Sequence, residues 1–193
     1  MKKIAIISVF LFTLICSQAI AGEYKIIKTD SDLNAIYGEA KQILLTNFGI
    51  VIRLPIKTQV VTGKKLDEFY HGKYRGAEIG LYRYGASGHE IYIMVDQEKD
   101  EALATLIHEM THAWQTESCP ANQDIIVKEG FARWVEYKSL DKIGAYVLAN
   151  RIKQQADPVY GVGFKKMLEW EDKVGEKQLP IKIRKVLTIN DNI

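Results

Sequence analysis

Two histidines with a glutamate between them stand in the middle of the chain, in the pattern His108-Glu109-Met110-Thr111-His112. Residues four positions apart lie one turn above the other on a helix, with Cβ atoms about 5–6 Å apart. Two imidazoles at that spacing can bind one ion, each nitrogen lying about 2.0–2.1 Å from zinc. Glu109, one position round the helix, can reach a metal-bound water without binding the metal, as a general base must. The pattern therefore predicts a Zn²⁺ site with Glu109 as its catalytic base.

A catalytic zinc site needs a third protein ligand, and the following segment offers two glutamates for it. Glu129 lies near the start of the next expected helix, and the adjacent Gly130 would let that helix pack closely. Two histidines and a glutamate leave one coordination position for water, which suits hydrolysis rather than a closed structural site. Glu136 is the alternative, on roughly the same helix face. It either replaces Glu129 as the third ligand or supports a metal-binding imidazole by accepting a hydrogen bond from its other ring nitrogen.

Four other polar side chains could have either a functional or a purely structural role. Tyr160, in a glycine-rich stretch, is a candidate to stabilise the oxyanion formed when water adds to a carbonyl; the alternative is packing or a loop hydrogen bond. His71 and His89 are expected in loops or at strand ends, where either could hydrogen-bond a substrate carbonyl. Cys119 has no base nearby in the sequence, so we expect an inert thiol.

The hydrophobic pattern places the histidine motif in a helix that follows a small sheet. Apolar residues recur at helical spacing from about residue 99 until the chain approaches Pro120, and Trp114 is expected in the core. Before this helix, the pattern predicts a helix over 31–48, capped by Asp30 or Ser31. Four β-like runs come between them, the last two forming a hairpin: 50–54, 59–62, 77–83 and 90–95.

Three more helices are expected after the motif, over 123–138, 142–155 and 163–173, with Trp134 in the core. The stretch 180–187 is weakly patterned, and no element is expected there. The sequence thus predicts an α+β fold: an N-terminal helix and a small mixed or antiparallel sheet, followed by the active-site helix and further helices.

The first 21 residues have the composition of an export signal. Lys2 and Lys3 precede an apolar run that is too short to span a bilayer, and the small residues Ala19 and Ala21 follow it. We expect cleavage after Ala21 and a single domain over 22–193, secreted or periplasmic and without membrane attachment. Cys16 would leave with the signal, so Cys119 could form no intramolecular disulfide.

Composition and charge narrow the class of protein further. Of 193 residues, 47% are hydrophobic and 26% charged, as in ordinary globular proteins. Removing Lys2 and Lys3 lowers Lys+Arg from 26 to 24, which equals the 24 Asp+Glu. With zero net charge and no lysine- or arginine-rich stripe, we expect no nucleic-acid partner.

Three segments resemble the C-terminal peptidase domain of the DA-one-like family, plant ubiquitin-activated, LIM-domain peptidases that limit organ growth. The segments are 108–114, 129–130 and 158–164, and the likeness covers roughly residues 76–183. In general plan the chain is also similar to gluzincin metallopeptidases. The resemblance implies a zincin-like fold and a zinc-dependent endopeptidase, with Glu109 as the catalytic glutamate and His108, His112 and Glu129 as the metal ligands.

The chain also departs from these families. It has no LIM cysteines or ubiquitin-binding helices, so ubiquitin is not carried over as a partner. Arg133 stands where gluzincins have an aspartate, four residues after the ligand glutamate.

Motif and resemblance together predict a secreted zinc peptidase that acts on peptides or proteins through a metal-activated water. An exposed strand, 78–83 or 90–95, would align an extended peptide with the metal. Two alternatives share the same ligands: an inactive zinc-bound binding module, and a metal-dependent amidase that acts on cell-wall peptides.

Overall fold

The computed structural model of the chain describes residues 25–71 and 79–193, so the expected export signal lies outside the described residues. The strands are β1 (Ile26–Ile27), β2 (Ile56–Val61), β3 (Gly80–Gly85), β4 (Gly88–Met94) and β5 (Gln97–Glu98). The helices are α1 (Asp30–Phe48), α2 (Gly63–Phe69), α3 (Lys99–Ser118), α4 (Ile125–Lys142), α5 (Tyr146–Lys153), α6 (Tyr160–Val174) and α7 (Leu179–Ile183). The predicted α+β order is confirmed. Within the described ranges, no helix has the length and apolar character needed to cross a membrane.

Helix α1 occupies the range predicted for it, but its cap is a different residue. Thr29 accepts the backbone N–H of Asp32 on its hydroxyl, and the Asp32 carboxylate accepts the N–H of Thr29, so the two close a capping box. Asp30 instead accepts the N–H of Val60 and ties the start of α1 to β2. The helix ends at Gly49, whose φ of 64° is left-handed.

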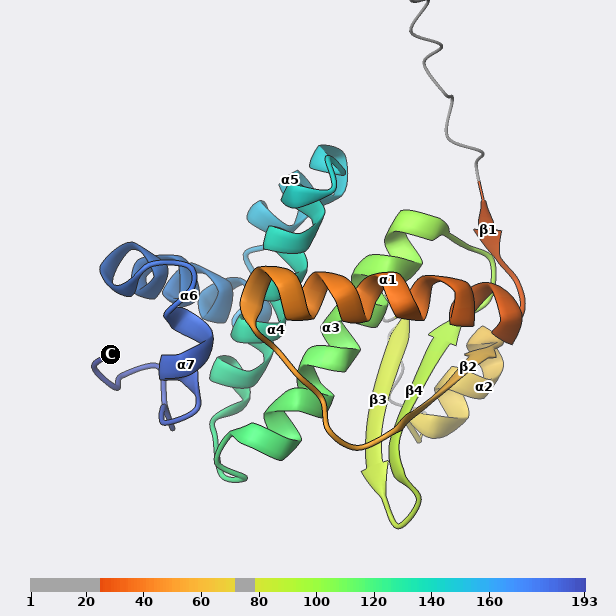
Figure 1. Ribbon diagram of the computed structural model, residues 1–193, viewed down its shortest axis with the longest axis horizontal. Coiled ribbons are helices and arrows are strands. Elements are labelled where there is room, and N and C mark those ends of the chain that lie inside the picture. Colours follow the sequence, from red (N-terminus) through yellow and green to blue (C-terminus); the bar gives the residue numbers. More distant parts are fainter. Residues whose placement is uncertain (1–24, 72–78) are drawn as a thin grey trace, which may run out of the picture.

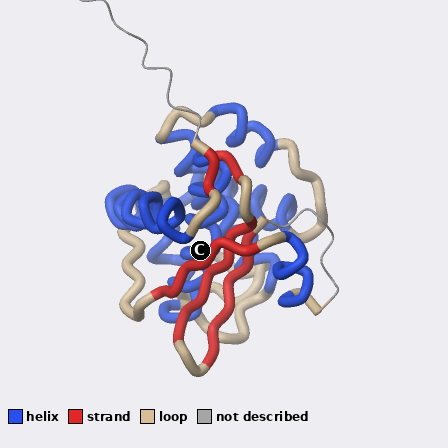
Figure 2. The backbone as a smooth tube through the Cα atoms, turned by 90° about the vertical axis from the view of Figure 1, so that its right-hand side faces the viewer, coloured by secondary structure: helices blue, strands red, loops and turns tan. Residues whose placement is uncertain are grey.

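The main sheet has three strands in the order β2-β4-β3 and is mixed (Figure 2). Strand β2 runs parallel to β4, whereas β3 and β4 form the predicted antiparallel hairpin, with Gly85 opposite Gly88. Because β4 is paired on both sides, the prediction that 90–95 could bind a peptide edge-on is wrong. Strand β3 pairs with β4 alone among the described strands, so it is the edge strand on this side; residues 77–78 of the expected strand lie outside the described residues.

The predicted strand over 50–54 does not form. The N–H groups of Arg53 and Leu54 donate to the carboxylate of Glu117 instead of to a neighbouring strand. A side chain from α3 therefore satisfies backbone donors that a ladder would otherwise take. Helices α2 and α7 and the two-residue strands β1 and β5 were not predicted, since elements this short show no clear hydrophobic period.

Helix α3 lies between the sheet and α4, and α4 to α7 gather on its far side (Figure 1). It contacts α1, β3 and β4 as well as α4, so nearly all its faces are covered. The side chains of Trp114 and Trp134 are 1% and 0% exposed, which confirms both as core residues. A helix buried on several sides holds its side chains firmly, as a metal site requires.

Helices α4 and α6 touch through their backbones at two glycines. A Cβ placed on Gly163 would lie 2.8 Å from the Cα of Gly130, closer than real Cβ atoms approach other atoms. The close packing predicted for Gly130 is thereby confirmed. Glu171 of α6 stabilises the packing of the two helices, because it accepts hydrogen bonds from Trp134 Nε1 (2.8 Å) and Lys138 Nζ (2.7 Å) of α4.

Candidate metal centre

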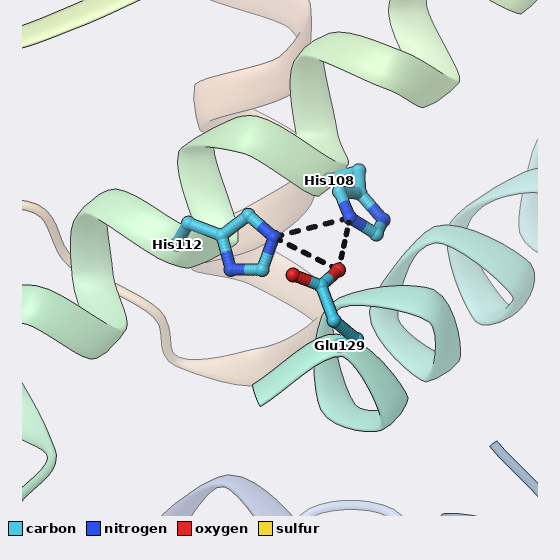
Figure 3. A group of neighbouring side chains, drawn as sticks. All are labelled: His108, His112 and Glu129. Carbon is cyan, nitrogen blue, oxygen red and sulfur yellow. Dashed lines mark hydrogen bonds and ion pairs between the residues drawn. The ribbon is translucent and has the colours of Figure 1, made fainter. Parts of the chain in front are cut away.

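Three side chains from two successive helices converge on one point. His108 and His112 project from α3 and Glu129 projects from α4, and their end groups face one another (Figure 3). The two Nε2 atoms lie 3.1 Å apart, and Glu129 Oε2 lies 3.3 Å from Nε2 of His108 and 3.4 Å from Nε2 of His112. Ligands about 2.0–2.1 Å from a tetrahedral zinc ion lie about 3.3–3.4 Å from each other. The triangle therefore has the dimensions of one face of a zinc coordination tetrahedron.

Hydrogen bonds behind the imidazoles set which ring nitrogen carries the proton. Nδ1 of His112 lies 2.8 Å from Oε1 of Gln115, an acceptor, so Nδ1 donates and Nε2 keeps its lone pair. The amide nitrogen of Gln115 donates to the carbonyl of Lys128, which anchors this support to the start of α4. His108 is held in the same way, because its Nδ1 lies 3.0 Å from Oε2 of Glu136. Both Nε2 atoms are thus presented as ligands.

The structure separates the roles of the two candidate glutamates. The carboxylate of Glu129 faces both Nε2 atoms, whereas that of Glu136 lies behind His108. Arg133 does not replace the gluzincin aspartate as an imidazole partner. Its Nη1 donates to Oε2 of Glu136 at 2.7 Å and so fixes the carboxylate that orients His108. Glu136 therefore supports the site and does not substitute for Glu129.

Burial and neighbouring charges shift the pKa values of Glu129 and His108 in opposite directions. Burial alone would raise the pKa of the Glu129 carboxyl, but the adjacent imidazoles outweigh burial and hold this pKa far below its usual range. Burial lowers the pKa of His108, whereas its hydrogen bonds to Glu129 and Glu136 raise it, with a net result of about 9. In the metal-free protein the site therefore holds a proton on His108, and a cation that binds there must displace it.

Glu109 lies beside the triangle without belonging to it. Its side chain is buried, and burial raises the pKa of its carboxyl. A Cβ on Gly80, the first residue of β3, would lie 3.0 Å from Oε1 of Glu109 and would overlap Thr105. Only glycine lets the edge strand pass so close to the predicted base. Gly80 had no role predicted from sequence; its one signal was a glycine inside the strand expected over 77–83.

Two cavities adjoin this group, with volumes of about 460 Å³ and 320 Å³. Both are lined by His108, Glu109, Tyr70 and Tyr160, and the larger also by His112 and Glu129. Tyr160, the first residue of α6, has its ring centre 6.3 Å from that of His108. The structure brings Tyr160 to the site; its role as an oxyanion stabiliser stays a prediction. Tyr70, which donates to the carbonyl of Gly80, was not singled out by sequence.

The remaining candidates lie apart from the metal-binding group or are inert. His89 is buried in β4, where its Nδ1 lies 2.8 Å from the Tyr82 hydroxyl and its Nε2 lies 3.0 Å from Glu117. Both ring nitrogens therefore have partners within the protein. His71 is exposed on the turn after α2. Cys119 lines the larger cavity, and burial raises the pKa of its thiol to about 12, which keeps it protonated as expected.

No protein-family model, no curated protein and no solved structure matches this chain. Two imidazole nitrogens and one carboxylate oxygen are a ligand set that suits zinc, and no other histidine, cysteine or acidic side chain of the described residues joins them. The arrangement can hold a divalent cation with a coordination position left for water or substrate.

Proposed function

We propose that the protein is a zinc-dependent hydrolase of zincin type that cleaves peptide bonds. The observation that carries this proposal is the triangle of His108, His112 and Glu129, with edges of 3.1–3.4 Å, beside the buried carboxyl of Glu109. Three protein ligands with an open fourth position are typical of catalytic zinc sites, whereas structural sites have four protein ligands. The resemblance of 108–114, 129–130 and 158–164 to the DA-one-like peptidase domain supports the same assignment of ligands and base.

A bound Zn²⁺ would supply an activated water and a polarised carbonyl. Glu109 accepts the proton of the attacking water as the C–O bond forms and delivers it to the leaving nitrogen as the C–N bond breaks. Its burial favours both halves of this transfer, because a pKa raised towards the operating pH makes the carboxylate a better base and still lets the carboxyl return the proton. No covalent intermediate is needed.

The edge strand β3 offers a way to align the substrate. Its first residue, Gly80, lies directly beside Glu109, and its outer edge is unpaired with any described strand. An extended peptide that adds to such an edge gains main-chain hydrogen bonds and runs past the metal. Tyr160, the first residue of α6, lines the same cavity and would stabilise the oxyanion. We infer that the substrate is an unfolded segment of a protein or a peptide.

Export to the periplasm or the exterior is part of the proposal. It is supported by the pattern of lysines, apolar run and small residues over 1–21. The substrate would then be an extracytoplasmic peptide or protein. Fractionation of cells that express the full chain, with mass determination of the mature N-terminus, tests cleavage after Ala21.

The decisive experiment measures zinc and turnover in the same preparations. Wild-type protein should contain about one zinc per chain and degrade a generic unfolded protein, and a chelator should abolish this activity. Glu109→Gln should keep its zinc and lose at least about 100-fold in rate. Glu101→Gln on the same helix is the matched control, because Glu101 forms a surface pair with the exposed Arg151.

Two results would overturn the proposal in different ways. Full activity in Glu109→Gln would remove Glu109 as the base. Bound zinc without turnover of any peptide by the wild type would favour the inactive binding module, and turnover of cell-wall peptides alone would favour the amidase.

A further inference from the structure

The smaller of the two cavities contains charged and polar side chains that the proposed mechanism does not use. It is about 320 Å³ in volume and shares His108 and Glu109 with the larger cavity. A peptide whose scissile bond lies at Glu109 would therefore extend into both cavities, one side of the bond in each. The smaller cavity adds Arg133, Gln155 and Glu136 to its wall. A substrate group next to the scissile bond would meet these side chains.

Arg133 is held rigidly in the wall of this cavity. It follows Glu129 by one helical turn on α4, so both side chains lie on the same face of that helix. Its Nη1 donates to Glu136 at 2.7 Å, and its Cζ lies 5.0 Å from the centre of the Tyr160 ring, within cation–π range. The side chain is only 19% exposed. A guanidinium fixed in this way loses little further freedom when it binds a ligand.

The guanidinium has more donors than its protein partners use. An arginine carries five N–H groups in a planar fork, and its Nη1 bond to Glu136 occupies one of them. The Nε atom is buried and has no hydrogen-bond partner among the described residues. Oε1 of Gln155, on the same wall, is also buried and lacks a partner there. Buried polar groups in folded proteins nearly always have partners. The unpaired N–H of Arg133 therefore indicates a ligand that offers an acceptor, and the amide of Gln155 would meet such a ligand with its NH₂ group.

The free N–H groups of Arg133 favour a ligand with two oxygens in one plane. Arg133 is the one lysine or arginine in the described lining of this cavity. The carboxylate of Glu136 is already engaged by Arg133 and by Nδ1 of His108, so it does not compete for the remaining donors. A planar guanidinium binds carboxylates bidentately and more strongly than it binds neutral amides.

We propose that Arg133 forms a carboxylate-binding subsite beside the metal-binding group, so that the preferred substrates carry a carboxylate next to the scissile bond. This inference rests on the proposed peptidase function. The carboxylate has two sources, the side chain of an aspartate or glutamate, or the free C-terminus of the substrate. The second source would make the protein release residues from the chain end.

The test compares matched peptides that differ in one group. One pair carries glutamate or glutamine at a residue flanking the scissile bond, and the other ends in a free acid or an amide. We expect the wild type to cleave one carboxylate member with a kcat/KM about 10- to 100-fold higher than its neutral partner. The pair that shows the difference identifies the source of the carboxylate. Equal cleavage within both pairs would refute the subsite.

Variants then separate recognition from structural support. Arg133→Gln should lower the carboxylate preference to within about threefold, and Arg133→Lys should keep part of it, because the charge remains and the planar fork is lost. Arg151→Gln, an exposed arginine on α5, is the matched control and should keep the full preference. Damage to the metal site would slow all peptides alike, and such a uniform loss with unchanged preference would overturn the assignment of Arg133.

A binding measurement distinguishes failure of this inference from failure of the proposed function. Zinc-loaded Glu109→Gln should bind the preferred carboxylate peptide more tightly than its neutral partner in calorimetry, and the double variant with Arg133→Gln should lose that difference. If the wild type cleaves nothing but the binding difference persists, the peptidase proposal fails and the subsite stands. If Glu109-dependent cleavage occurs without any carboxylate preference, the subsite fails and the peptidase stands.

Discussion

Zinc affinity should rise steeply with pH, because the metal must displace a proton from His108. In the metal-free protein, burial lowers the pKa of His108, but the carboxylates of Glu129 and Glu136 raise it by more than burial lowers it. The resulting pKa is about 9. A protonated imidazole cannot bind a metal, so displacement costs free energy at every pH below that value. At pH 7, about two units below that pKa, the cost is about 3 kcal/mol, which corresponds to an apparent affinity about 100-fold weaker.

Competition with a chelator of known pH dependence measures this effect. Between about pH 7 and pH 9 the apparent Kd for zinc should fall about tenfold per pH unit, and above that range it should level off. Calorimetry at pH 7 in two buffers of different ionisation enthalpy should show about one proton released per zinc bound. A Kd that is constant across this range, or binding without proton release, would refute the argument for His108.

Glu136→Gln tests the physical cause of the raised pKa. The substitution removes the charged acceptor of the His108 Nδ1–H, so the levelling of the Kd curve should move to lower pH. It should also weaken zinc binding about 10- to 100-fold at high pH, since the imidazole loses the partner that orients it. Glu101→Gln, in the exposed pair with Arg151, should leave the whole curve unchanged. An unchanged curve in Glu136→Gln would contradict the support that we assign to Glu136.

Three further predictions concern the framework that holds the site, each measured by urea unfolding of the metal-free protein. Gly163→Ala should lower the free energy of unfolding by about 1–3 kcal/mol or more, because its Cβ would overlap the backbone of α4. Gly38→Ala, at a position of α1 with open space around it, should raise the free energy of unfolding by about 0.4–1 kcal/mol. Equal effects of the two substitutions would contradict the backbone contact. Glu117→Gln should lower the free energy of unfolding by about 1–3 kcal/mol, because the backbone N–H groups of 53–54 and the ring of His89 lose a charged acceptor. A decrease no larger than that caused by Glu169→Gln, at an exposed glutamate, would contradict this network. Thr29→Ala should cost about 0.5–2 kcal/mol through loss of the capping box, and a neutral result would show that α1 does not depend on that cap.

The local pattern was enough to predict the parts of the site that lie within one helix. The pairing of His108 with His112 follows from spacing alone, because residues four apart on any α-helix lie on one face. The apolar period predicted α3 and the core positions of Trp114 and Trp134 for the same reason, and the glycine-bounded turn predicted the β3–β4 hairpin. Each of these depends on contacts a few residues apart, so the sequence determines them directly.

The tertiary structure decided how separate elements meet. Glu129 and Glu136 share one face of α4, and only the placement of α4 against α3 puts the first beside Nε2 of His112 and the second behind His108. Likewise β4 became the central strand through its parallel pairing with β2, and Gly80 came to lie on Glu109 through the packing of β3 on α3. These outcomes depend on register and rotation between segments far apart in the chain, which local spacing leaves undetermined and which the packing of the whole core selects.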